Sequence, residues 1–111
     1  MRLPDLEAWA TFATVADHSS FSAAAAAMGV SKATVSKTVA RLEASLGQSL
    51  FHRTSRRLTL TEAGKPLAER ARRMLAEAVA AEEAAHDAAS APAGRVRLAA
   101  PMTFGVTNVA P

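Results

Sequence analysis

Two helical segments joined by a short glycine-containing turn limit the possible folds of this chain more than any other feature of its sequence. Residues 23–28 are nearly all alanine, and Ser22 before them offers a hydroxyl that can cap a helix. Gly29 follows as a left-handed carboxy-terminal cap, and Ser31 caps a further helix over residues 32–46, which Gly47 ends. A helix, a short turn with glycine and a second helix are the layout of a helix-turn-helix.

A first helix is predicted over residues 4–17, because apolar residues recur there at helical spacing. Pro4 suits a first helical turn, and the acidic residues that follow it complement the helix dipole. We also expect Val30 to fill the core within the turn. The expected core-facing stripe of this first helix comprises Leu6, Trp9, Phe12, Ala13, Val15 and Ala16.

The helix over residues 32–46 has two different sides. Its apolar stripe comprises Val35, Val39, Leu42 and Leu46. Its opposite side carries Ala33, Thr34, Ser36, Lys37, Ala40 and Arg41. Short side chains allow a helix to approach a major groove closely, and hydroxyls and amines hydrogen-bond to phosphates and base edges. An ordinary surface helix would carry glutamates and longer polar residues, so the pattern favours DNA binding.

Cationic charge is concentrated in the middle third of the chain, although the net charge is only +3. Between residues 31 and 60 a single acidic residue, Glu43, accompanies the basic ones. This distribution is typical of a polyanion-binding surface, with a solvated charged face as the alternative. The basic residues are Lys32, Lys37, Arg41, Arg53, Arg56 and Arg57.

A β-hairpin with a basic tip is predicted after the third helix. Phe51 is apolar, residues 58–61 alternate between apolar and polar, and residues 52–57 between them are basic and hydroxyl-bearing. Three arginines that follow a candidate recognition helix favour phosphate or minor-groove contact, and a solvated loop is the alternative.

Residues 61–89 predict one long helix of roughly 40 Å. Its apolar positions recur in alternating steps of four and three, which favours pairing with a second copy of the chain. We expect the helix to pack on its own domain for the first two turns only. Pro66 either kinks the first turn or places the start of the regular helix nearer Lys65. The predicted dimer interface, called here the linker seam, comprises Leu67, Ala71, Met74, Leu75, Ala78, Ala81 and Ala85.

Several function classes are disfavoured. The sequence contains no cysteine, its three histidines are scattered without metal-ligand spacing, and it has no glycine-rich phosphate loop. We therefore expect neither an enzyme nor a cofactor nor a metal site. No apolar run reaches the ~20 residues needed to span a bilayer, and the acidic start does not match a signal peptide. These features favour a cytoplasmic protein without a membrane partner.

The order of these features resembles the amino-terminal region of LysR-type transcriptional regulators. The resemblance covers about residues 3–90. The matching residues are Ser20-Phe21-Ser22, Ala24-Ala25, Val30-Ser31, Thr34-Val35-Ser36-Lys37, Leu42-Glu43, Leu46-Gly47, Leu50-Phe51-His52-Arg53 and Leu58-Thr59-Leu60-Thr61-Glu62-Ala63-Gly64.

The resemblance implies a mainly α fold, a winged helix-turn-helix with a two-stranded β wing and a long dimerisation helix. It divides the chain into a DNA-binding domain at 1–60, a linker helix at 61–90, a hinge at 91–94 and the start of an effector-binding domain at 95–111. That last domain is an α/β fold like that of periplasmic binding proteins, and nearly all of it is absent here. Thr103 matches a position that lies near the effector.

The function that the resemblance implies is sequence-specific transcriptional regulation in the bacterial cytoplasm, associated with the nucleoid. The family binds an interrupted palindrome in double-stranded DNA as a dimer through antiparallel linker helices, and full-length members are commonly tetrameric. A small-molecule effector acts through the missing domain, and RNA polymerase is a candidate partner. The alternatives are a non-specific architectural DNA-binding protein and a pure oligomerisation module.

Carried over residue by residue, the resemblance implies DNA contacts from the third helix, the helix starts and the wing. Lys32 stands where the family usually has glutamine. Glutamine reads adenine, whereas lysine prefers guanine acceptors or phosphate. The implied DNA-binding residues are Ser22, Ser31, Lys32, Ala33, Thr34, Ser36, Lys37, Arg41, Arg53, Thr54, Arg56 and Arg57.

Overall fold

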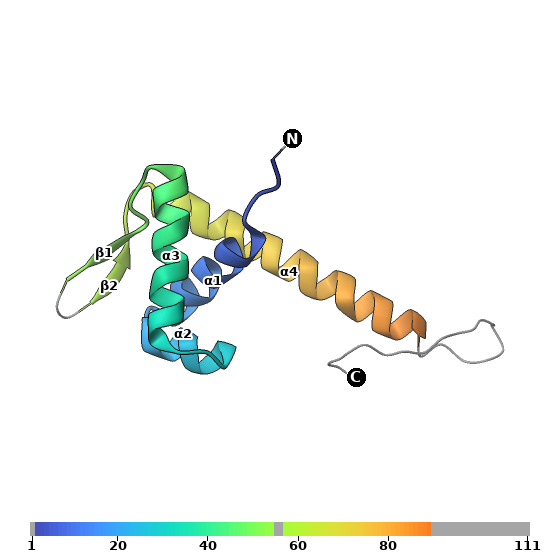
Figure 1. Ribbon diagram of the computed structural model, residues 1–111. Coiled ribbons are helices and arrows are strands. Elements are labelled where there is room, and N and C mark those ends of the chain that lie inside the picture. Colours follow the sequence, from blue (N-terminus) through green and yellow to red (C-terminus); the bar gives the residue numbers. More distant parts are fainter. Residues whose placement is uncertain (1, 55–56, 90–111) are drawn as a thin grey trace. The chain divides into compact units, whose positions relative to one another are not determined.

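A computed structural model describes residues 2–54 and 57–89 of the chain (Figure 1). It confirms a mainly α fold with a two-stranded antiparallel sheet. The described residues belong to two compact units, with the boundary after Leu75. The elements are α1 (Leu6–His18), α2 (Phe21–Met28), α3 (Lys32–Leu46), β1 (Phe51–Arg53), β2 (Leu58–Leu60) and α4 (Gly64–Ala89).

The core of the first unit lies where α1, α2 and α3 pack against one another, with Leu50, Phe51 and the first turns of α4. Phe12 is fully buried, and its ring meets that of Phe51 edge-on at 5.4 Å. Phe51 also meets Phe21 at 5.9 Å between ring centres. Most other core residues are alanine or valine, so the helices approach one another closely.

Side chains set the helix starts. Asp5 caps α1, because its carboxylate accepts a hydrogen bond from the Ala8 amide at 3.2 Å, so the helix begins at Leu6 rather than at residue 4. Ser20 caps α2 through its hydroxyl, which accepts from the Ala23 amide at 3.0 Å. The prediction of Ser22 as this cap was therefore wrong. Ser22 is the second residue of the helix.

The carboxy-terminal glycine caps are as predicted: Gly29 and Gly47 both have left-handed backbone angles. Two core predictions were wrong, because Leu6 is 60% exposed and Val30 is 41% exposed. Thr11 and Thr38 are buried instead. Each donates its hydroxyl to the carbonyl one turn earlier, at 2.9 and 2.8 Å, so a polar residue enters the core with its donor satisfied.

The predicted hairpin is present, with Phe51 opposite Leu60 and Arg53 opposite Leu58. Phe51 is buried, and Leu58 and Leu60 pack against the core from the second strand. Beyond the strands, the Thr54 hydroxyl accepts from the Arg57 amide at 3.1 Å and donates to the Arg57 carbonyl at 2.9 Å. The hairpin is therefore closed by its own residues near the tip.

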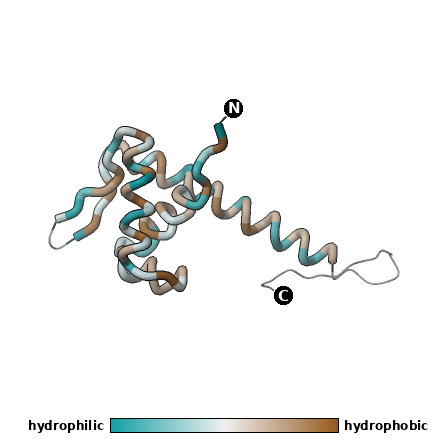
Figure 2. The backbone as a smooth tube through the Cα atoms, in the orientation of Figure 1, coloured by the Kyte–Doolittle hydropathy of each residue, from teal (hydrophilic) through white to brown (hydrophobic). Residues whose placement is uncertain are grey.

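The start of α4 explains how Pro66 fits. The Thr61 hydroxyl accepts from the Gly64 amide at 2.9 Å, and the helix begins at Gly64 rather than at 61. Pro66 is then in the first turn, where a backbone N–H has no partner within the helix. This agrees with the alternative that placed the start nearer Lys65. Figure 2 shows hydrophilic and hydrophobic residues alternating along α4.

Candidate nucleic-acid interface

The outward side of α3 is exposed while its apolar stripe is covered. Val35, Thr38, Val39 and Leu42 are buried, and Leu46 packs against the core. The predicted two-sided character of this helix is thus confirmed. Ser36 is half-buried, and the remaining residues of the outward side are exposed. We define the recognition surface as the exposed residues at and near the amino-terminal end of α3, which are Ser31, Lys32, Ala33, Thr34 and Lys37.

The amino-terminal end of α3 combines free amides with a nearby ammonium group. The Ser31 hydroxyl accepts from the Thr34 amide at 3.1 Å and lies 2.9 Å from the Thr34 hydroxyl. The amides of Lys32 and Ala33 belong to the first turn, where no carbonyl within the helix can accept from them. Such an end favours an anion, and Lys32 adds positive charge beside it.

The cationic side chains of the middle third divide into paired and unpaired ones. Lys32, Lys37 and Arg57 form no ion pair with any residue in 2–54 or 57–89. Arg41 and Arg53, by contrast, each bind carboxylates of the same chain. The resemblance had grouped all five as DNA-contacting candidates, and the structure separates them by their partners.

Arg41 connects α3 to the start of α1. Its Nε donates to Asp5 at 2.6 Å, and its Nη2 donates to Asp5 and to Glu7, both at 3.2 Å. The hydrogen bond from Arg41, supported by that from the Ala8 amide, lowers the pKa of Asp5, and the bond to Asp5 raises the pKa of Arg41. Two carboxylates therefore already neutralise a guanidinium that the resemblance had placed among the DNA-binding residues.

Arg53 is held in a second ion pair, which the sequence also did not indicate. Its Nη2 donates to Glu43 at 2.8 Å, and its guanidinium lies over the Phe21 ring, 5.2 Å from the ring centre. Glu43 had been counted only as an isolated negative charge. Its side chain is 15% exposed and joins α3 to the wing.

The linker seam is only partly available to a second chain. Ala71 is fully buried in its own unit, and Leu67 and Leu75 pack against the same core. The prediction that Ala71 faces a partner was therefore wrong, because packing on the chain's own core continues to Leu75 instead of ending after two turns. Met74, Ala78, Ala81 and Ala85 are exposed.

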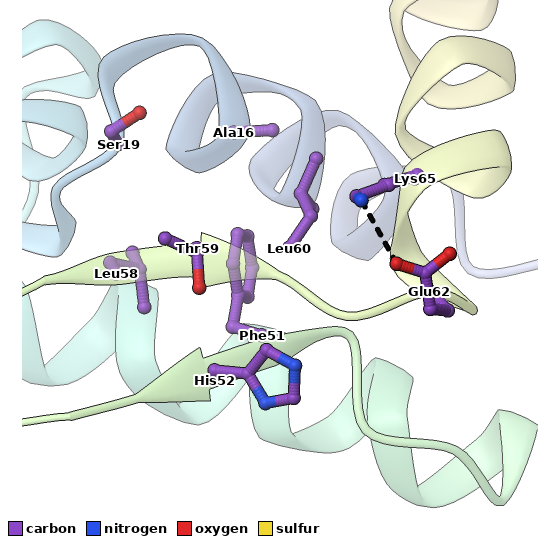
Figure 3. A pocket seen from close by; sticks show the side chains of 9 residues that line it. All are labelled: Ala16, Ser19, Phe51, His52, Leu58, Thr59, Leu60, Glu62 and Lys65. Carbon is purple, nitrogen blue, oxygen red and sulfur yellow. Dashed lines mark hydrogen bonds and ion pairs between the residues drawn. The ribbon is translucent and has the colours of Figure 1, made fainter.

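A surface pocket of about 580 Å³ lies beside the wing (Figure 3). Phe51, Leu58 and Leu60 give it an apolar wall, and Lys65 donates to Glu62 at 2.9 Å at one end. No sequence pattern indicated it. Within the part of the chain that the structure describes, no group of three or more His, Asp or Glu residues could hold a metal ion, and no helix is long and apolar enough to cross a membrane.

Some predicted positions lie outside the described residues. They are Arg56 of the wing, the hinge at 91–94 and the segment 95–111 with Thr103.

Comparison with known proteins gives consistent matches. The family model described as "Bacterial regulatory helix-turn-helix protein, lysR family" matches residues 6–65. The HTH-type transcriptional regulator PtxR of Pseudomonas aeruginosa is 47% identical over 93 residues, which are 84% of this chain and 30% of PtxR. The chain thus spans under a third of that relative's length.

Two solved structures resemble the fold. A mutant of OxyR from Corynebacterium glutamicum, bound to H2O2, has a TM-score of 0.74 and 31% identity over 79% of this chain and 28% of its own. The DNA-binding domain of BenM, in complex with catB site 1 DNA, has a TM-score of 0.71 and 25% identity. That match covers 80% of this chain and 99% of the BenM domain.

Proposed function

Because the chain belongs to the LysR family of bacterial regulatory helix-turn-helix proteins, we propose that it binds double-stranded DNA through α3 and acts as a transcriptional regulator rather than as an enzyme. The observation that carries this proposal is the recognition surface. It combines two lysines that form no ion pair among the described residues, short side chains and a helix amino terminus on one exposed side. The solved BenM domain, of similar fold, is in complex with DNA.

Within this proposal, Lys37, Thr34 and Ser36 face base edges, and Ala33 allows the helix to approach them. Lys32 and the amides beside Ser31 bind phosphate. Ser22, in the first turn of α2, adds a further donor, and Thr54, Arg56 and Arg57 bring the wing to the backbone or the minor groove. Arg41 is not included, because its guanidinium forms ion pairs with Asp5 and Glu7.

A second copy of the chain pairs through the exposed part of the linker seam. The charges of α4 support an antiparallel arrangement. Residues 64–75 carry four basic residues and only Glu69, whereas residues 76–89 carry four acidic residues and no lysine or arginine. Antiparallel helices place the basic part of each copy beside the acidic part of the other. Two recognition helices then reach successive major grooves of an interrupted palindrome.

The remaining parts of the proposal concern the longer regulator. There, the region that starts at 91–111 binds a small effector near Thr103, dimers associate into tetramers, and the protein contacts RNA polymerase on the nucleoid in the cytoplasm. The family supports these roles, and none of them depends on the contacts described above.

The proposal is tested by selecting bound sites from random DNA and measuring affinity for a selected and a scrambled duplex over a range of salt. We expect Lys37→Ala to lose about 1–2 kcal/mol on the selected duplex and much less on the scrambled one. Arg57→Ala should weaken both equally and reduce the salt slope by about 0.9. Equal losses for Lys37→Ala would refute base reading. A wild-type protein without a preferred site would be a non-specific architectural binder.

A further inference from the structure

The side chain of Arg53 joins three elements of the DNA-binding unit. It starts from β1, donates from Nη2 to Glu43 of α3 at 2.8 Å, and stacks its guanidinium over Phe21 of α2 at 5.2 Å. Phe21 in turn meets Phe51, the buried residue of the same strand. The wing is therefore attached to both helices of the helix-turn-helix through one arginine.

The environment of Glu43 makes it unfavourable for Arg53 to exchange this carboxylate for a DNA phosphate. Its Oε1 accepts from Arg53, and its Oε2 accepts from the Leu50 amide at 2.7 Å, so both carboxylate oxygens have partners within the chain. With its side chain 15% exposed, the carboxylate has little water to replace a lost cation. A mostly buried carboxylate without its partner is strongly unfavourable. If Arg53 bound a DNA phosphate instead, Glu43 would be left as such an unpaired carboxylate.

The hairpin itself needs such an attachment. Each of its strands has three residues, and an isolated two-stranded hairpin is marginally stable. Phe51 anchors one end of β1 in the core, and Arg53 fixes the other end, next to the basic tip. Loss of Arg53 would leave the tip free to change its angle to α3.

We infer that Arg53 is a positioning residue, which holds the wing at a fixed orientation to α3 through Glu43 and makes no DNA phosphate contact of its own. This inference rests on the proposed function, in which the wing tip meets DNA. It assigns the direct contact to Arg57, which has no ion pair with any described residue and is exposed. Arg53 and Arg57 thus form a matched pair on one hairpin, with the same side chain and different roles.

The salt dependence of DNA affinity separates these roles. Each phosphate contact contributes about 0.9 to the slope of log K against log salt, because a neutralised phosphate releases condensed counterions. For the 111-residue chain on its selected duplex, we expect Arg57→Gln to reduce the slope by about 0.9. Arg53→Gln should weaken binding about tenfold while it leaves the slope unchanged. A slope reduced by about 0.9 for Arg53→Gln, or an unchanged affinity, would overturn the inference.

Two further variants test the role of Glu43. Glu43→Gln should weaken binding about as much as Arg53→Gln, and the double variant should be no weaker than either, since both remove one attachment. Arg53→Lys should recover only part of the affinity, because lysine lacks the planar group that stacks on Phe21. Additive losses in the double variant would contradict a shared role.

A measurement without DNA keeps the inference separate from the proposed function. Amide hydrogen exchange in the free protein should show faster exchange at Leu50 and in both strands for Arg53→Gln and Glu43→Gln, with α1 unchanged. Arg57→Gln should exchange like wild type. Failure of the wild type to bind DNA would refute the proposed function alone, whereas unchanged exchange in both variants would refute the positioning role alone. If Arg53→Gln does not fold, Glu43→Gln provides the same test.

Discussion

The first and second parts of α4 contain the same kind of residue at the same spacing but differ in exposure. In residues 64–75 the small residues Gly64, Ala68 and Ala71 are buried in the chain's own unit. In residues 76–89 the alanines at equivalent steps, such as Ala78 and Ala81, are exposed. Helical spacing shows which residues share a face. It does not show whether the same chain or a second one covers that face.

The contacts of the first part account for the difference. Arg72 donates to Asp17 at 2.6 Å, and Leu67 and Leu75 pack on the core of the helix-turn-helix. In our proposal a second copy of the chain packs against the exposed residues of the second part. The comparison therefore predicts that substitutions at the buried residues of α4 change folding and that those at its exposed residues change association.

The largest expected effect comes from placing a glutamate at matched positions of the two parts. Ala71→Glu introduces an unpaired charge at a fully buried site, and we expect a loss of about 3–5 kcal/mol in the free energy of unfolding. Ala78→Glu introduces the same group at an exposed site. It should change unfolding of the monomer by at most about 0.5 kcal/mol and weaken self-association at least tenfold.

Chemical denaturation at several protein concentrations measures the free energy of unfolding, and sedimentation velocity measures self-association. An intact dimer with Ala78→Glu would exclude pairing through this part of α4. Met74→Glu offers a check one turn earlier, at a residue that is 37% exposed next to the boundary between the two units. We expect it to act on association as well.

The second prediction concerns Gly64, the first residue of α4. A Cβ on Gly64 would lie 2.3 Å from the backbone oxygen of Leu50, which also accepts from the Thr61 amide. In an ordinary helix interior, glycine to alanine gains about 1 kcal/mol. Here the clash should reverse the sign, so we expect Gly64→Ala to lose about 1–3 kcal/mol. A stabilised variant in a urea titration would show that α4 can move away from Leu50 at little cost.

Local signals predicted much of this fold. The caps at Ser31, Gly29 and Gly47 and the alternation in β2 act over a few residues, and the structure places them as expected. One error arose at the start of α2. Ser22 was predicted as the cap, but the structure shows that the hydroxyl of Ser20 accepts from the Ala23 amide.

The candidate site was less predictable because its charges act across the fold. Arg41 is 36 residues from Asp5 in sequence, and Arg53 is ten from Glu43. Their charge suggested DNA contacts, but only tertiary structure shows that carboxylates lie within hydrogen-bond distance of them. The predicted DNA and effector contacts themselves remain predictions.

A smaller effect is expected at Ser19, between α1 and α2. Its φ of 52° lies in the left-handed region, which costs a residue with a Cβ more than it costs glycine. We expect Ser19→Gly to gain about 0.5–1 kcal/mol in unfolding without a change in self-association. Thermal unfolding measures the gain in stability, and sedimentation measures self-association. Together they test whether the unit that contains α1 and α2 is stabilised without a change in dimerisation. A shift in the dimer equilibrium would show that the two properties are coupled.

The smallest expected effect comes from the exposed ion pair at the start of α4. The hydrogen bond from Lys65 lowers the pKa of Glu62, so the folded state favours its charged form. A carboxylate with a lowered pKa stabilises the fold above its unfolded pKa, and that contribution disappears as the pH falls through the folded value. The difference in urea midpoint between wild type and Glu62→Gln should therefore be larger at pH 6 than at pH 3. In a Lys65→Met background it should be absent at both pH values. A difference as large at pH 3 as at pH 6 would mean that Glu62 stabilises the start of α4 by packing rather than by charge.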